Sequence, residues 1–124
     1  MGDAGILAAD DRIELIDGEM IEMAPIGAMH ASKVARLSRI LSAAVGDHAI
    51  VWTQNPIALP PRDEPQPDIC LLQPRADDYE GNLPLAAEVL LVIEVSDTTL
   101  AYDLDVKVPL YARHGIPDVW ILSV

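Results

Sequence analysis

The segment from Glu88 to Ser96 constrains the fold more than any other part of the chain. Every residue from Val89 to Ile93 is apolar, so a strand built from this run would bury both of its faces. The run is far too short to cross a bilayer as a helix. We therefore expect a central strand of a sheet that carries packed layers on both sides.

The other regular segments follow from periodicity and from turn residues. Asp17-Gly18 lies between two short apolar segments and predicts a β-hairpin in which Ile16 pairs with Glu19. Helical spacing of apolar residues predicts two helices, the second of which contains the disruptive Pro109. The predicted helices span residues 30–45 and 103–114, and the predicted strands span residues 13–16, 19–23, 49–53, 56–59, 66–72, 88–96 and 118–122. Residues 60–65 and 73–85 are expected to form loops, the second of them exposed. This order predicts one α/β domain over residues 1–124, a mixed sheet with helices packed on it and an N-terminal β-hairpin.

Composition limits the partners that such a domain can bind. With 8 Lys and Arg against 20 Asp and Glu, the formal charge is 8 − 20 = −12, which argues against gripping nucleic acid or an anionic membrane by bulk charge. The single Cys70 lies in an apolar run and cannot form an intrachain disulfide, which fits a reducing cytoplasm. A role on nucleic acid therefore needs a local exception to the acidic balance.

One segment offers such an exception. Lys33, Arg36 and Arg39 place 3 of the 8 cations within seven residues of the first predicted helix. They are candidate contacts to a phosphate backbone. The alternative is an ordinary solvated face opposite the apolar side of the helix.

Glu94 is the most informative single residue, because it interrupts the apolar central strand. Alternation places its carboxylate on the same strand face as Val92, where an unpaired charge would cost several kcal/mol. The residue therefore needs a partner or a metal ion. The simpler alternatives are a strand end that emerges into solvent and a structural ion pair.

Asp68 and Lys107 add to this pattern. Asp68 opens another apolar strand, although aspartate after proline is also typical of turns. Together with Glu94 it would place two carboxylates on adjacent strand ends, which is a minimal set of oxygen ligands for Mg²⁺. Lys107 lies on the helix that follows the Glu94 strand. It either forms an ion pair with Asp103, four residues earlier, or places an ammonium next to a metal site to neutralise phosphoryl charge.

These residues, in this order, carry a resemblance to a known family. Pro67-Asp68-Ile69, Val92-Ile93-Glu94-Val95-Ser96 and then Lys107 resemble the PD-(D/E)XK nuclease superfamily. The chain is more closely similar to the bacterial Uma-type "putative restriction endonucleases". The residues that carry this similarity are Glu14 to Glu19, His30, Gln66-Pro67-Asp68, Ile93 to Ser96, Lys107 and Tyr111 to Ile121. The resemblance implies a restriction-endonuclease-like fold and a metal-dependent endonuclease that hydrolyses DNA phosphodiester bonds.

The resemblance also suggests roles for individual residues. Mg²⁺ or Mn²⁺ would be held by Asp68, Glu94 and the backbone carbonyl of Val95, with Lys107 stabilising charge in the transition state. Ser96 stands where the superfamily's compact motif has its lysine, and the Uma-type branch takes that lysine from the following helix, which points to Lys107.

Three further residues match family positions with less definite roles. Glu14 and Glu19 could supply a further contact to the metal or to water, or they could lie on a solvated hairpin face. His30 could lie at the substrate edge, or serve as a structural residue at the helix start. Family members usually extend further at both ends, so the chain resembles a form truncated at the C-terminus, after the Trp120 strand.

Three functions remain open at this point. The first is a DNA endonuclease, for which cutting both strands would require two sites and favours a homodimer. The second is a catalytically inactive member of the fold that binds nucleic acid or has a structural role, which the charge of −12 favours. The third is a phosphoesterase acting on small nucleotides, which would need no basic groove.

Overall fold

The computed structural model describes residues 12–23 and 26–124 of the chain. Its first element is the predicted hairpin of β1 (Arg12–Ile16) and β2 (Glu19–Met23). Ile16 pairs with Glu19 across the turn, which confirms the predicted register. Gly18 takes a positive φ of 81°, which glycine adopts without the steric cost that a side chain would bring.

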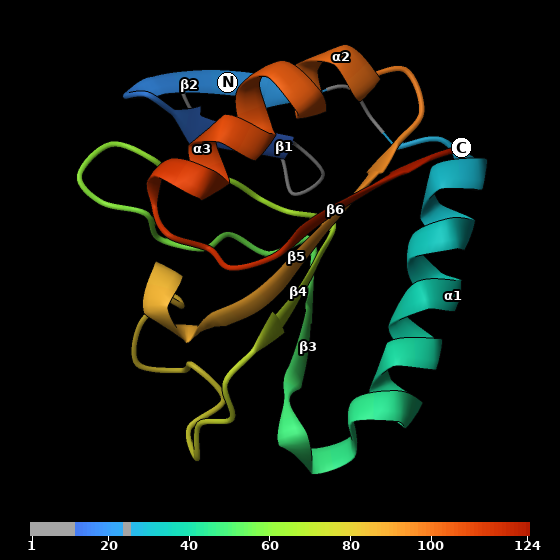
Figure 1. Ribbon diagram of the computed structural model, residues 1–124, viewed down its shortest axis with the longest axis vertical. Coiled ribbons are helices and arrows are strands. Elements are labelled where there is room, and N and C mark those ends of the chain that lie inside the picture. Colours follow the sequence, from blue (N-terminus) through green and yellow to red (C-terminus); the bar gives the residue numbers. More distant parts are fainter. Residues whose placement is uncertain (1–11, 24–25) are drawn as a thin grey trace, which may run out of the picture.

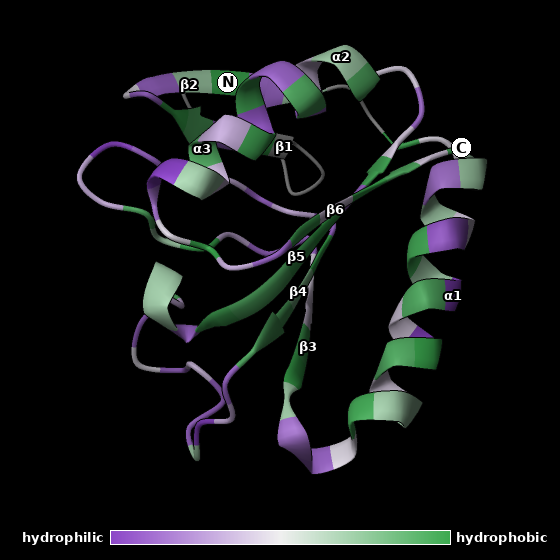
Figure 2. Cartoon of the chain, in the orientation of Figure 1, coloured by the Kyte–Doolittle hydropathy of each residue, from purple (hydrophilic) through white to green (hydrophobic). Residues whose placement is uncertain are grey.

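A four-stranded mixed sheet forms the centre of the molecule (Figure 1). Its order is β3 (Ile50–Thr53), β4 (Ile69–Leu72), β5 (Val89–Ser96) and β6 (Val119–Ser123). β4 runs antiparallel to both β3 and β5, whereas β6 runs parallel to β5. β5 has a neighbour on each side and is hydrophobic along nearly all of its length (Figure 2), so the predicted central strand is confirmed.

One face of the sheet is covered by α1 (Ala28–Val45), which begins two residues earlier than predicted. Val34 of this helix is buried against Ile69, Leu91, Ile93 and Val95 of the sheet, and Leu37 and Leu41 pack beside it. The helix ends at Gly46, whose φ of 53° favours a glycine. The predicted glycine stop is confirmed.

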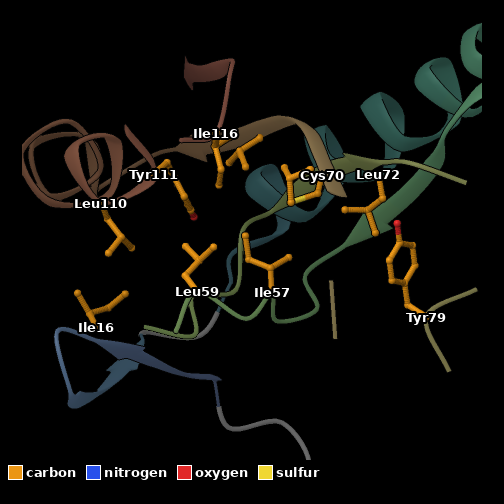
Figure 3. Packing of buried hydrophobic residues seen from close by; sticks show 11 residues of the cluster. Ile16, Ile57, Leu59, Cys70, Leu72, Tyr79, Leu110, Tyr111 and Ile116 are labelled. Atoms are coloured by element: carbon orange, nitrogen blue, oxygen red, sulfur yellow. The ribbon is translucent and has the colours of Figure 1, made fainter. Parts of the chain in front are cut away.

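The opposite face carries the larger core, built around α2 (Leu100–Tyr102), η4 (Asp103–Lys107) and α3 (Val108–Arg113). Figure 3 shows its side chains coming from the hairpin, the strands and α3. The buried members of this core are Ile16, Ile57, Leu59, Cys70, Leu72, Tyr79, Val89, Val92, Leu110, Tyr111 and Ile116. Cys70 is a free, buried thiol, as its apolar surroundings in the sequence predict.

The second helical segment is continuous from Leu100 to Arg113 but is not α-helical throughout. Residues Asp103–Lys107 form a π-helical turn, in which the N–H of Val108 reaches back five residues to the carbonyl of Asp103. Pro109 follows directly, near the start of α3. A proline has no N–H to donate and its ring crowds the preceding turn, so a widened turn accommodates it better than a regular α-helix. The predicted disturbance is confirmed and takes this form.

Two predicted strands differ in the structure. Residues 56–59 form no strand; Ala58 and Leu59 make only isolated bridges to Leu85 and Asp63. The strand predicted over residues 66–72 begins only at Ile69. Prolines at positions 56, 65 and 67 explain both corrections, because proline cannot donate to a strand ladder.

The segment 73–85 is a loop, but it is not exposed throughout as predicted. Tyr79 is buried, with its hydroxyl donating to the carbonyl of Gln73 at 2.5 Å. Its ring meets Trp52 edge-on at a centroid distance of 6.0 Å, and the guanidinium of Arg75 lies 4.6 Å from the ring centre. These aromatic contacts tie the loop to β3. Among the described residues, no helix has the length and apolar character needed to cross a membrane.

Candidate active site

The site lies where β4 begins and β5 ends, because antiparallel pairing places these two ends at the same edge of the sheet. Asp68 immediately precedes β4 and Glu94 lies near the end of β5, and both are almost fully buried. The backbone N–H of Asp68 donates to Glu94 Oε1 at 3.0 Å. The N–H of Val95 donates to Asp68 Oδ2 at 2.8 Å. The two carboxylates that the sequence singled out therefore share one site.

Lys107 reaches this site from the π-helical turn and is only 2% exposed. Its ammonium lies 2.9 Å from Glu94 Oε2 and 2.5 Å from Glu14 Oε1. The simple ion pair with Asp103 does not form. Asp103 instead accepts hydrogen bonds from the hydroxyls of Ser96 and Thr99.

Glu14 enters the site from the hairpin. The hairpin is fastened to the chain preceding β4 by paired backbone hydrogen bonds between Leu15 and Glu64, at 3.1 and 2.7 Å. Glu14 Oε1 also accepts the N–H of Gln66 at 2.7 Å. Its second oxygen, Oε2, is buried and has no hydrogen-bond partner within the described residues. An orphaned carboxylate oxygen is costly, so it marks a position where a cation or a water molecule would be favoured.

A pocket of about 100 Å³ opens over these groups. His30, near the start of α1, closes one side and lies 3.1 Å from Asp68 Oδ2 through its Nε2. The lining residues are Glu14, Met23, Ile26, Gly27, His30, Gln66, Asp68, Glu94, Val95, Asp97, Thr98, Thr99, Asp103 and Lys107. Such a volume accommodates a few water molecules or a partly hydrated ion together with part of a phosphate group.

The charges in the pocket are not balanced. Burial and the neighbouring Glu94 raise the pKa of Asp68 to about 6, although hydrogen bonds from Val95 and His30 lower it in part. Burial opposes the charge of Lys107, but Glu94 and Glu14 outweigh this effect and hold the pKa of the ammonium above its ordinary value. The carboxyl groups of Glu14, Asp68 and Glu94 surround a single ammonium, so acidic groups outnumber basic ones here and a divalent cation would be favoured.

Not every predicted residue reaches the pocket. Glu19 is exposed on β2 and does not line it, although it shares a hairpin face with Glu14. Lys33, Arg36 and Arg39 are exposed on α1, beyond His30 and outside the pocket. The structure thus brings together Glu14, His30, Asp68, Glu94 and Lys107, and leaves the other four at the surface.

Tyr111 also reaches the site, although its place in the sequence predicted no role for it there. Its hydroxyl donates to Glu94 Oε2 at 2.6 Å, and the residue is fully buried. Burial and the adjacent Glu94 raise the pKa of Tyr111 well above its ordinary value, so the hydroxyl stays a donor. The sequence held two signals: Tyr111 opens a segment that resembles the Uma-type family, and its spacing of four from Lys107 places both on one side of a helix.

The pocket offers oxygen ligands, the type that Mg²⁺ prefers. Within the described residues, no three His, Cys, Asp or Glu side chains converge closely enough to hold an ion by themselves. Mg²⁺ does not require this, because it is commonly bound by one or two carboxylates and keeps several waters. Asp68 and Glu94 fit that pattern, and the excess negative charge and the orphaned Glu14 oxygen both favour a cation.

Residues 5–124 match the family described as "Uma2: Putative restriction endonuclease". The chain belongs to the Uma2 family. This Uma2 chain also resembles a crystal structure described as "a putative nuclease belonging to DUF820" from Anabaena variabilis ATCC 29413, with a TM-score of 0.69 and 17% sequence identity. The match covers 90% of this chain and 65% of the other, so it confirms the nuclease-like α/β fold. A search of curated proteins found no match.

Proposed function

We propose that the chain is a metal-dependent endonuclease that hydrolyses DNA phosphodiester bonds. The observation that carries this proposal is the buried excess of negative charge around Asp68 and Glu94, with one lysine beside it, in a chain of the Uma2 family. A phosphodiester is itself an anion, so it would enter such a pocket only with a cation that compensates the charge.

Asp68 and Glu94 would hold Mg²⁺ or Mn²⁺, together with the carbonyl of Val95. Backbone groups alternate along β5, and those of Val92 and Ser96 bond to the β6 side. The groups of Val95 therefore face the β4 side, toward Asp68. A bound divalent ion would supply an activated water and neutralise charge on the phosphate.

Lys107 would act on the phosphate directly. An ammonium has three N–H donors, and Glu14 and Glu94 accept two of them. The third would donate to a phosphoryl oxygen in the pocket, where it would stabilise charge that develops in the transition state. Burial strengthens this contribution, because little water screens the ammonium.

DNA would approach along α1. His30 lies at the pocket, and Lys33, Arg36 and Arg39 follow on the same helix, exposed to solvent. No ion pair to these three cations is seen among residues 12–23 and 26–124, so they could contact successive phosphates. A homodimer would supply the two sites needed for a double-strand cut, and the buried free Cys70 fits a cytoplasmic location.

The test is a cleavage assay on supercoiled and single-stranded DNA with Mg²⁺ or Mn²⁺. We expect activity in the wild type and a loss of at least about a hundredfold in Asp68→Ala and Lys107→Ala, since each removes an electrostatic contribution of this order. Glu14→Gln and Glu19→Gln form a matched pair on one hairpin face. Only the first, inside the pocket, should impair cleavage.

Each alternative has its own result. Cleavage that survives Asp68→Ala would refute the site assignment. A folded wild-type protein that binds DNA without cutting it under any of these conditions would favour a binding or structural role. Turnover of a dinucleotide without cleavage of DNA would favour a phosphoesterase for small nucleotides.

A further inference from the structure

Both carboxylate oxygens of Glu94 have partners inside the protein. Its Oε2 accepts the Tyr111 hydroxyl at 2.6 Å and lies 2.9 Å from Lys107 Nζ. Its Oε1 accepts the backbone N–H of Asp68 at 3.0 Å. The two oxygens are thus distinguished: one turns toward the helix and the other toward the start of β4.

The two contacts on Oε2 come from one helical segment. Lys107 and Tyr111 are four residues apart and lie on the same side of that segment. The ammonium also lies 5.7 Å from the centre of the Tyr111 ring, within the range of a cation–π interaction. Tyr111 therefore touches both members of the Lys107–Glu94 pair.

Tyr111 itself cannot move without disturbing the core. It is fully buried, and Figure 3 shows its ring packed among Leu110, Leu59 and the other apolar side chains on this side of the sheet. A hydroxyl on a ring fixed in this way has a fixed position, so the hydrogen bond transfers the rigidity of the core to the carboxylate.

We infer that Tyr111 is a positioning residue that fixes the orientation of the Glu94 carboxylate, so that Oε1 rather than Oε2 is presented on the Asp68 side of the pocket. The effect of this orientation on cation binding rests on the proposed function, in which Glu94 holds a metal ion. Groups that hydrogen-bond a metal ligand orient it and tune its affinity.

The competing explanation is that the Tyr111 hydroxyl forms this hydrogen bond only because a buried hydroxyl needs an acceptor, with no effect on the orientation of Glu94. Tyr79 provides a matched control, because it is also buried and its hydroxyl also makes one short bond, to the Gln73 carbonyl at 2.5 Å. It lines no part of the pocket. Tyr111→Phe and Tyr79→Phe each remove one hydroxyl from a buried tyrosine, so Tyr79→Phe shows what the loss of such a hydroxyl does away from the pocket.

The first measurement needs no metal. In the wild type, the ¹³C carboxyl resonance of Glu94 reports its hydrogen bonding, and the ¹H–¹⁵N signal of the Lys107 ammonium reports whether Glu94 Oε2 stays beside it. Tyr111→Phe should move both signals, whereas Tyr79→Phe should leave both in place. Unchanged signals in Tyr111→Phe would overturn the inference whether or not the protein is a nuclease.

The second measurement is Mg²⁺ or Mn²⁺ titration by calorimetry on the full chain. Tyr111→Phe should weaken binding about tenfold, the lower end of what loss of such a hydrogen-bonding partner costs, and Tyr79→Phe should bind as the wild type does. Equal affinity in wild type and Tyr111→Phe would also overturn the inference. If the wild type binds neither ion, the proposed function fails, and the carboxyl and ammonium signals alone decide whether Tyr111 orients Glu94.

Discussion

Replacing Asp68 by asparagine should stabilise the metal-free protein near neutral pH. The pKa of Asp68 is raised from its ordinary 3.8 to about 6, first by burial and then by the charge of Glu94. The folded state therefore binds the proton of this carboxyl more tightly than the unfolded state does. One pKa unit corresponds to about 1.4 kcal/mol, so ionised Asp68 costs the folded state about 3 kcal/mol above pH 7.

The sign of the pH dependence follows from the same shift. Below pH 3.8 both states carry the proton and Asp68 contributes no difference. As the pH rises from about 4 to about 6, only the unfolded state loses the proton, so the free energy of unfolding falls by about 1.4 kcal/mol per unit. Above about pH 7 both states have lost the proton, and this carboxyl no longer changes the free energy of unfolding with pH. In Asp68→Asn this contribution disappears.

Asparagine is nearly the same size and its side-chain oxygen can still accept the N–H of Val95. Part of the gain will be lost at His30, so we expect Asp68→Asn to raise the free energy of unfolding by about 2 kcal/mol at pH 7.5. Urea unfolding at pH 5 and pH 7.5 measures this, with the exposed Asp47→Asn as control.

Mg²⁺ gives the complementary result. A ligand that binds only the folded state stabilises it, by about 3 kcal/mol at one hundred times its dissociation constant. Excess Mg²⁺ should therefore stabilise the wild type and have little effect on Asp68→Asn. The reasoning is refuted if Asp68→Asn is destabilised at pH 7.5 without metal, or if its unfolding free energy keeps the pH dependence of the wild type between pH 4 and 6.

Two further predictions concern the cations. Lys107→Met leaves Glu14 and Glu94 buried without their countercharge and should lower the free energy of unfolding by about 3–5 kcal/mol, as measured by urea unfolding. Adding Glu14→Gln should restore part of this loss. A double variant no more stable than Lys107→Met would contradict the assigned ion pairs. If Lys33, Arg36 and Arg39 contact phosphates, a plot of the logarithm of the association constant for duplex DNA against the logarithm of salt concentration should have a slope of about −3. The slope should approach zero when all three residues are replaced by alanine. An unchanged slope would mean that DNA binds elsewhere.

Much of the fold could be predicted because local patterns determine it. Asp17-Gly18 determined the hairpin and its register, and the apolar run before Glu94 determined the central strand. The patterns failed where proline overrides periodicity. Residues 56–59 are a short apolar run typical of a strand but form none. Pro109 turns the predicted helix into a π-helical turn followed by a short α-helix.

The site was predictable only in part, and the reason is sequence distance. Asp68 and Glu94 stood out because each is a carboxylate at the edge of an apolar strand. The contact between Glu14 and Lys107 joins residues 93 apart, and no periodicity could distinguish Glu14 from Glu19 on the same hairpin face. Which of the two is buried depends on how the hairpin is fastened to residues 62–66.

The way the site is assembled ties it to the stability of the whole domain. Glu14 comes from the hairpin, Glu94 from the sheet and Lys107 from the helical segment, so the ion pairs exist only when all three are packed together. The same packing buries Ile16 of the hairpin and Tyr111 of α3 in one apolar core. If the hairpin detached, Lys107 would lose one of its two countercharges and water would reach the other, which weakens the attraction several-fold. The buried charges therefore depend on the apolar core around them, and a variant that loosens the hairpin should impair the site even though it alters no residue in the pocket.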